Sequence, residues 1–160
     1  MDLIEILEKE FEKYPKKVLF CLREKKCVEI VEKITSIQRT KSSNLTGKII
    51  ICAGNASKNV LDEFNLDYMA NANRKKSKNE QKIKERLLRN ADIIVLTLEE
   101  CEDPKMDCLT KERNGGKVII DLIITDQIAE RDFFAPLRFG CKNMIEIEKS
   151  VIIYLERYSV

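Results

Sequence analysis

Residues 48–53 read Lys-Ile-Ile-Ile-Cys-Ala and lead straight into a polar turn, Gly-Asn-Ala-Ser-Lys, at residues 54–58. Two more runs rich in Ile, Val and Leu follow at residues 92–97 and 117–124, and only Asp121 interrupts the latter. Near-continuous apolar runs of this length are typical of strands buried on both faces of a parallel sheet. Residues 77–90 carry a narrow stripe of Ile83, Leu87 and Leu88, which predicts a crossover helix between the first two strands.

The segments on either side of this unit are predicted from their periodicity. Residues 2–14 form an amphipathic helix that Pro15 ends, residues 16–38 repeat a helical stripe, and residues 39–47 read as a polar loop. Residues 144–147 are predicted as a short edge strand, and Ser150 as the cap of a helix that runs to Tyr158. We therefore expect a single α/β domain over residues 1–160, a three-layer sandwich with a largely parallel or mixed central sheet and a helical N-terminal segment at residues 1–40.

Composition excludes several classes of protein. The chain has 160 residues, 44% hydrophobic and 35% charged, with a net charge of +2, which fits one globular domain. No apolar run reaches the roughly 18 residues of a membrane span and no secretory signal is visible, so we expect a soluble cytoplasmic protein with no membrane partner. The absence of histidine excludes histidine-dependent hydrolase triads. The six cysteines form no C-x-x-C pair, and Cys21, Cys27 and Cys52 lie among apolar residues, where we expect core packing.

The turn at residues 54–58 is the first candidate for chemistry. Ligands of open α/β sheets bind outside the carboxyl ends of the strands, where helix N-termini present free N–H groups. Gly54 allows a close backbone approach, Asn55 and Ser57 can hydrogen-bond, and Lys58 places a cation in the first turn of a helix. A cation there opposes the helix dipole unless an anion is bound, so the turn predicts a phosphate site. The alternative is a tight turn whose lysine is only solvated.

The residues around this turn resemble a known family. Residues 48–64, KIIICAGNASKNVLDEF, are similar to the opening of the inosine triphosphate pyrophosphatase family, in which a strand runs into a Thr/Ser-Gly-Asn-x-x-Lys turn that holds the nucleotide triphosphate. Ala53 stands where that family has a hydroxyl residue, and the later Asp-Ser-Gly-Leu signature with its metal-binding acid is absent. The resemblance implies an inosine triphosphate pyrophosphatase-like fold and a nucleotide cradle, with nucleoside triphosphate pyrophosphatase activity as an alternative function.

A second resemblance concerns the chemistry. The length, the Lys/Ile/Glu-rich composition and the modified Gly-Asn-x-x-Lys turn resemble the HcgB-type guanylyltransferases, which act in the biosynthesis of the FeGP cofactor of Fe-hydrogenase in methanogenic archaea. This resemblance implies a homodimeric nucleotidyltransferase that moves GMP from GTP to a pyridinol hydroxyl and releases pyrophosphate. In this scheme the phosphates are held by Gly54, Asn55, Ser57 and Lys58.

Other candidate residues follow the later strands. Asp126 is the carboxylate best placed to hold Mg²⁺ beside a triphosphate, and we expect Asp126 and Lys58 to be catalytic. The alternative for Asp126 is to cap the helix that begins near Gln127, a role that Thr125 could also take. Asp121 requires a partner, because a lone buried carboxylate is costly. Further contacts to the nucleotide are expected from Arg74, Lys75, Thr97, Thr125 and Arg131.

Two further stretches of the sequence are rich in charged residues of one sign. Residues 74–89 hold eight basic residues against two acids, a charge that attracts a triphosphate or a nucleic acid but also fits the solvated face of a crossover helix. Because no aromatic residue is interleaved there, we do not expect a nucleic-acid partner, and a basic module that binds RNA or a protein is the non-enzymatic alternative. The acidic residues 99–103 are predicted as a solvated loop.

Overall fold

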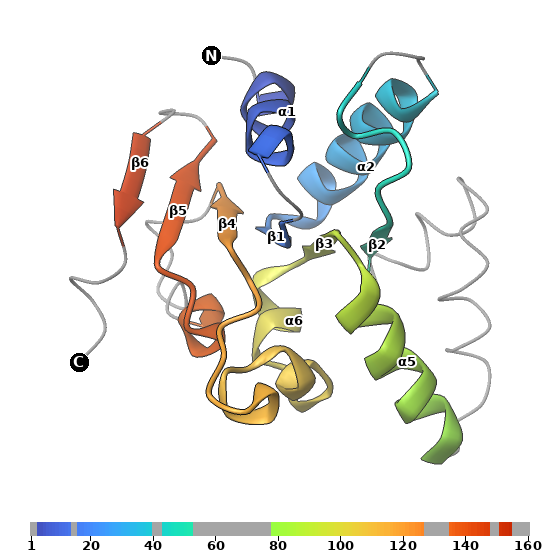
Figure 1. The fold of residues 1–160 in the computed structure, drawn as a ribbon, viewed down its shortest axis with the longest axis vertical. Coiled ribbons are helices and arrows are strands. Elements are labelled where there is room, and N and C mark those ends of the chain that lie inside the picture. Colours follow the sequence, from blue (N-terminus) through green and yellow to red (C-terminus); the bar gives the residue numbers. More distant parts are fainter. Residues whose placement is uncertain are drawn as a thin grey trace.

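The structure, a computed structural model, describes residues 3–13, 16–39, 43–52, 78–126, 135–147 and 151–154 (Figure 1). The helices in these ranges are α1 (Leu3–Lys13), α2 (Glu24–Gln38), α5 (Lys78–Asn90) and α6 (Leu98–Glu102), with the 3₁₀ helices η1 (Pro104–Leu109), η2 (Glu112–Asn114) and η3 (Ala135–Phe139). The strands are β1 (Val18–Cys21), β2 (Ile50–Cys52), β3 (Ile93–Leu96), β4 (Leu122–Thr125), β5 (Asn143–Glu146) and β6 (Val151–Tyr154).

The strands form one sheet in the order β2-β3-β1-β4-β5-β6. The first five are parallel, and β6 pairs antiparallel with β5. Val18 of β1 is level with Ile93 on one side and Leu122 on the other, so β1 lies at the centre of the parallel part. The predicted α/β fold with a largely parallel sheet is confirmed, whereas the specific likeness to the inosine triphosphate pyrophosphatase fold stays a prediction.

Helices cover both faces of the sheet (Figure 1). On one face, α1 and α2 pack on alternate strand residues such as Phe20 and Val95. On the other, α5, α6, η1 and η3 pack on the intervening residues, such as Leu19 and Ile94. This alternation explains the continuous apolar runs, because each strand residue is buried against one layer or the other. The predicted three-layer sandwich is therefore confirmed.

The prediction of a helical segment over residues 1–40 is wrong at its centre. Within the predicted residues 2–14, Leu3–Lys13 form α1, but the stretch from residue 16 contains β1 before α2 begins at Glu24. All four β1 residues are fully buried. A short apolar run satisfies both a helical and a strand pattern, and here pairing with β3 and β4 decides between them.

The C-terminal predictions also need correction. Val151–Tyr154 is strand β6 and not part of a helix that starts at Ser150, because its backbone pairs with β5. Strand β5 is therefore an interior strand and not an edge. Strand β4 takes up only the end of the predicted run at residues 117–124. The predicted crossover helix at residues 77–90 is confirmed as α5.

Two further expectations concern the composition. None of the helices that the structure describes is long and apolar enough to cross a membrane. All six cysteines are free thiols and all are buried. This confirms the core packing predicted for Cys21, Cys27 and Cys52.

Candidate functional site

The topology singles out the carboxyl end of β1. The chain leaves β1 toward α2 on one face of the sheet, whereas it leaves β3 toward α6 on the other face. The connection after β4 includes η3, which also packs on that second face. Ligands of open α/β sheets bind where neighbouring connections diverge in this way. The segments that meet there are residues 22–24, 97–100 and 125–126.

The N-terminus of α2 is held by a carboxylate from β4. Arg23 is the N-cap residue and its side chain makes no capping hydrogen bond. Instead its backbone N–H donates to Asp126 Oδ1 at 3.3 Å. Burial raises the pKa of Asp126, against the hydrogen bonds it accepts and the charges of Arg23 and Lys26. Asp126 is thus a half-buried carboxylate that faces two cations and a helix N-terminus.

The segment after β3 is a helix and not the predicted acidic loop. Thr97 caps α6, because its hydroxyl accepts from the Glu100 N–H at 3.2 Å while its own N–H donates to Glu100 Oε1 at 2.9 Å. Burial, and then the charge of Glu100, raise the pKa of the Cys52 thiol to about 12. Glu100 therefore lies close to the end of β2 as well as to the end of β3. The sequence predicts Glu100 in a solvated loop, whereas in the structure this residue is half-buried.

The other described candidate, Thr125, lies beneath the edge. Its side chain has no exposed surface, and its carbonyl accepts the N–H of Ile147 at 3.0 Å. A ligand at the edge meets Asp126 before it meets Thr125. Among the predicted site residues that the structure describes, Asp126 and Thr97 follow strands on either side of β1.

The remaining candidates lie outside the described residues: Gly54, Asn55, Ser57, Lys58, Arg74, Lys75 and Arg131. The start of their segment is nevertheless fixed, because Cys52 ends β2 level with Val95 of β3. Strands β2 and β1 flank β3, a separation of about 10 Å. The described part of β2 thus ends on the same edge as Arg23 and Asp126.

Arg23, Lys26 and Glu100 are residues that the sequence interpretation missed as members of this edge. The sequence does contain a signal for Arg23 and Lys26, because residues 18–22 are a continuous apolar run and charged residues at the start of a helix follow it directly. Because this run also fits the helical pattern predicted for residues 16–38, the sequence alone does not mark its carboxyl end as the end of a strand.

The described residues could supply only part of the ligand shell of a Mg²⁺ ion. No group of three or more Cys, Asp or Glu side chains in the described ranges is arranged to hold a metal ion. Mg²⁺ in nucleotide sites usually takes one or two carboxylates and completes its shell with phosphate oxygens and water. Asp126, with one oxygen on the Arg23 N–H, fits the role of such a single carboxylate.

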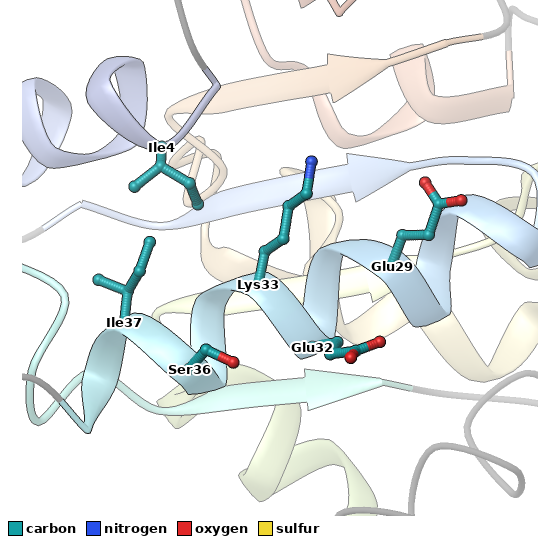
Figure 2. Close-up of a pocket in the computed structure, with 6 residues that line it drawn as sticks. All are labelled: Ile4, Glu29, Glu32, Lys33, Ser36 and Ile37. Atoms are coloured by element: carbon teal, nitrogen blue, oxygen red, sulfur yellow. The ribbon is translucent and has the colours of Figure 1, made fainter.

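A separate pocket lies between α1 and α2 (Figure 2). Its volume is about 510 Å³, and it is lined by Ile4 of α1 and by Glu29, Glu32, Lys33, Ser36 and Ile37 of α2. Figure 2 shows Ile4 and Ile37 at one end and the charged side chains along α2. The pocket contains none of the predicted site residues.

Two comparisons with known proteins find no relative of this chain. A scan against models of protein families finds no match, and a search of curated proteins finds none either.

Proposed function

We propose that this chain is a nucleotidyltransferase that moves GMP from GTP to a pyridinol hydroxyl and releases pyrophosphate. The observation that carries the proposal is the meeting of Arg23, Lys26 and Asp126 at the carboxyl end of β1, on the edge where β2 also ends. Cations at a helix N-terminus favour phosphate groups, and the switch point of an open α/β sheet is the usual place for a nucleotide. The choice of GTP and of a pyridinol acceptor rests on the resemblance stated above.

The reaction requires an acceptor oxygen to attack the α-phosphorus while the bond to pyrophosphate breaks. In this proposal Gly54, Asn55, Ser57 and Lys58 hold the phosphates, and Arg23 and Lys26 add positive charge at the neighbouring strand end. Catalysis then comes from positioning and from charge stabilisation, since the chain has no histidine to act as base.

Asp126 is proposed to receive the acceptor's proton or to hold Mg²⁺. Its raised pKa makes it a stronger base than an exposed aspartate, and the Arg23 N–H keeps one carboxylate oxygen in place. Bound Mg²⁺ would neutralise phosphate charge as a Lewis acid. We expect this activity in the cytoplasm.

The proposed homodimer has a candidate interface at β6. This strand is an edge of the sheet, and its residues Val-Ile-Ile-Tyr include no proline and no charge. Edge strands without such residues pair readily with another chain, and two copies of β6 can pair antiparallel about a two-fold axis. Light scattering should give a dimer for the parent and a monomer for Ile152→Lys.

A labelled-nucleotide assay tests the function. The protein is incubated with GTP labelled at the α-phosphate, with Mg²⁺ and with small-molecule extract from a methanogen. Transfer of the label to a new compound, with release of pyrophosphate, supports the transferase. Equal release of labelled GMP without any extract identifies a pyrophosphatase instead, and GTP that stays intact in both incubations rejects both activities.

A further inference from the structure

Exposed cations gather at the edge of the sheet opposite the candidate site. Parallel strands all start at one edge, so the segments that precede them share it. Among the described residues the exposed cations at the C-terminal end of α5, before β4 and β5, and on the adjoining η1 and η2 are Arg86, Arg89, Lys105, Lys111, Arg113, Lys117 and Lys142. We call this set the basic edge.

Contacts join these segments into one surface. Helix α5 packs against η1, and η1 packs against η2. Burial raises the pKa of the Cys108 thiol in η1, and the positive charge of Arg89 counteracts part of this rise. Because Arg89 is in the last turn of α5, this end of α5 lies close to η1. Gly140, in the segment before β5, lies so close to Lys111 that a Cβ atom placed on it would be 3.7 Å from the Lys111 Cβ. The segment before β5 therefore packs against the residue that precedes η2.

The acids on the same segments are less exposed than these cations. Asp107 pairs with Arg138 at 2.9 Å, and the Asp103 carboxylate accepts the Lys105 N–H at 2.9 Å. Asp92 and Asp121 accept backbone N–H groups and keep their negative charge, and Glu85 and Glu112 are charged as well, but among these acids only Glu112 is exposed. Seven exposed cations of the basic edge thus face one exposed acid among the described residues of these segments, so its surface is positive in a chain whose total charge is only +2.

The chemistry of this surface favours a phosphate backbone over a protein. Protein interfaces depend on buried apolar and aromatic anchors, and in the described ranges the only large hydrophobic residue that is exposed is Ile49, before β2. Phosphate contacts need only lysine and arginine. Proteins that bind single strands stack bases on aromatic side chains, whereas the aromatic side chains described here, Phe11, Phe20 and Phe139, are buried.

We propose that the basic edge binds a double-stranded nucleic acid through its phosphates, without reading its sequence. The prediction against a nucleic-acid partner considered residues 74–89 alone, whereas these cations are spread from residue 86 to residue 142 and meet only in the folded sheet. The surface is distinct from the carboxyl edge proposed for GTP, so neither proposal depends on the other.

Fluorescence anisotropy of labelled 20-base-pair DNA and RNA duplexes tests the proposal on the full chain. We expect parent affinity to fall steeply between 50 and 200 mM salt, as counterion release requires. The variant Lys111→Glu with Arg113→Glu should bind at least about tenfold more weakly and show a salt slope shallower by about two phosphate contacts. The matched control, Lys9→Glu with Lys33→Glu, makes the same charge change on exposed positions of α1 and α2 and should bind like the parent.

The outcomes separate the possibilities. Equal losses in both variants would show an effect of net charge and overturn the proposal, as would a parent without salt-dependent binding. Displacement of the duplex by polyglutamate as readily as by unlabelled duplex would also overturn it, since any acidic polymer would then serve. If the glutamate variant does not fold, Lys111→Gln with Arg113→Gln replaces it, and an affinity equal to the parent's would reject the basic edge. A duplex preferred as DNA or as RNA identifies the natural source.

Discussion

Lys17 and Asp121 are joined by two hydrogen bonds, because the Lys17 N–H donates to Asp121 Oδ2 and the Asp121 N–H donates to the Lys17 carbonyl, both at 2.8 Å. Ile49 and Asp92 repeat the arrangement with distances of 2.8 and 2.9 Å. Each aspartate precedes a strand, and its partner precedes another strand of the parallel sheet. The pairs thereby satisfy the carboxylates and fix the starting register, which explains how Asp121 is accommodated in an apolar run.

The Asp121 pair predicts a graded loss of stability. Asp121→Ala leaves the Lys17 N–H without its acceptor and should lower the free energy of unfolding by about 1 to 3 kcal/mol. Asp121→Asn keeps an oxygen acceptor and should lose less. Urea unfolding at pH 7 measures both, and equal losses would show that the acceptor oxygen is not what matters.

Lys17 also ties β1 to the end of α5. Its Nζ donates to the carbonyls of Leu88, Arg89 and Ala91 at 2.6, 2.7 and 2.7 Å. Lys17→Met keeps the length of the side chain but leaves these carbonyls without their donor, so the free energy of unfolding should fall by about 1 to 3 kcal/mol. Lys82→Met on the exposed side of α5 is the control, and a parent-like Lys17→Met would argue against the cap.

The buried thiols predict a loss of stability in alkali. Burial, with smaller contributions from neighbouring groups, raises the pKa of Cys52 from 9.0 to about 12 and that of Cys141 from 9.0 to about 11. Above pH 9 the unfolded chain ionises these thiols while the folded chain keeps them protonated. Each should therefore lower the free energy of unfolding by about 1 kcal/mol at pH 10, and the loss continues up to the folded pKa.

Lys17 acts in the opposite sense, because burial lowers its pKa from 10.5 to about 8. Between pH 8 and pH 10.5 the unfolded chain binds this proton more tightly than the folded chain does, so the contribution of Lys17 to the free energy of unfolding increases with pH. One amine opposes several thiols, so we still expect a net fall. Urea unfolding under reducing conditions at pH 8, 9 and 10 measures it. Cys141→Ala should make the fall shallower, and a parent whose stability stays constant over this range would contradict the prediction.

Asp126→Asn separates a role of the charge from a role as a cap. Asparagine keeps an oxygen for the Arg23 N–H, so the free energy of unfolding should change by less than about 1 kcal/mol. A carboxylate binds a hard cation or accepts a proton better than the amide of asparagine does. The rate of GMP transfer from GTP should therefore fall, and a higher Mg²⁺ concentration should be needed to restore it. Glu99→Gln, on the exposed surface of α6, is the control. A variant that melts early with an unchanged Mg²⁺ dependence would assign Asp126 a structural role.

Lys58→Ala tests the turn after β2. If Lys58 contacts the triphosphate, GTP binding should weaken by the value of a charge-assisted hydrogen bond, about 1.5 to 3 kcal/mol, with little change in melting temperature. Calorimetric titration with GTP measures the affinity, and Lys82→Ala controls for the loss of one exposed cation. Unchanged affinity in Lys58→Ala would reject the phosphate cradle.

Elements whose hydrophobic pattern fits only one kind of structure are predictable from the sequence. Helices α1 and α5 have apolar residues on one side only, so each must lie on a core with that side inward. The runs that became β2 and β3 are apolar at every position, which predicts burial on both faces and hence a parallel sheet under two helical layers. The turn predicted at residues 54–58 likewise depends on residues that are neighbours in the chain, and because it lies outside the described residues it stays a prediction.

Elements and sites that depend on partners far away in the chain are not predictable in this way, because folding alone brings those partners together. The apolar residues 18–21 and 151–154 fit a helix or a strand, and they become β1 and β6 because backbone pairing with β3, β4 and β5 satisfies their N–H and C=O groups. Arg23 and Asp126 are 103 residues apart and meet because β4 lies beside β1. The basic edge likewise exists only because parallel strands bring the segments before them to one side of the sheet. Local sequence encodes which residues are buried, whereas strand order, which depends on all of the strands together, decides which of them become neighbours.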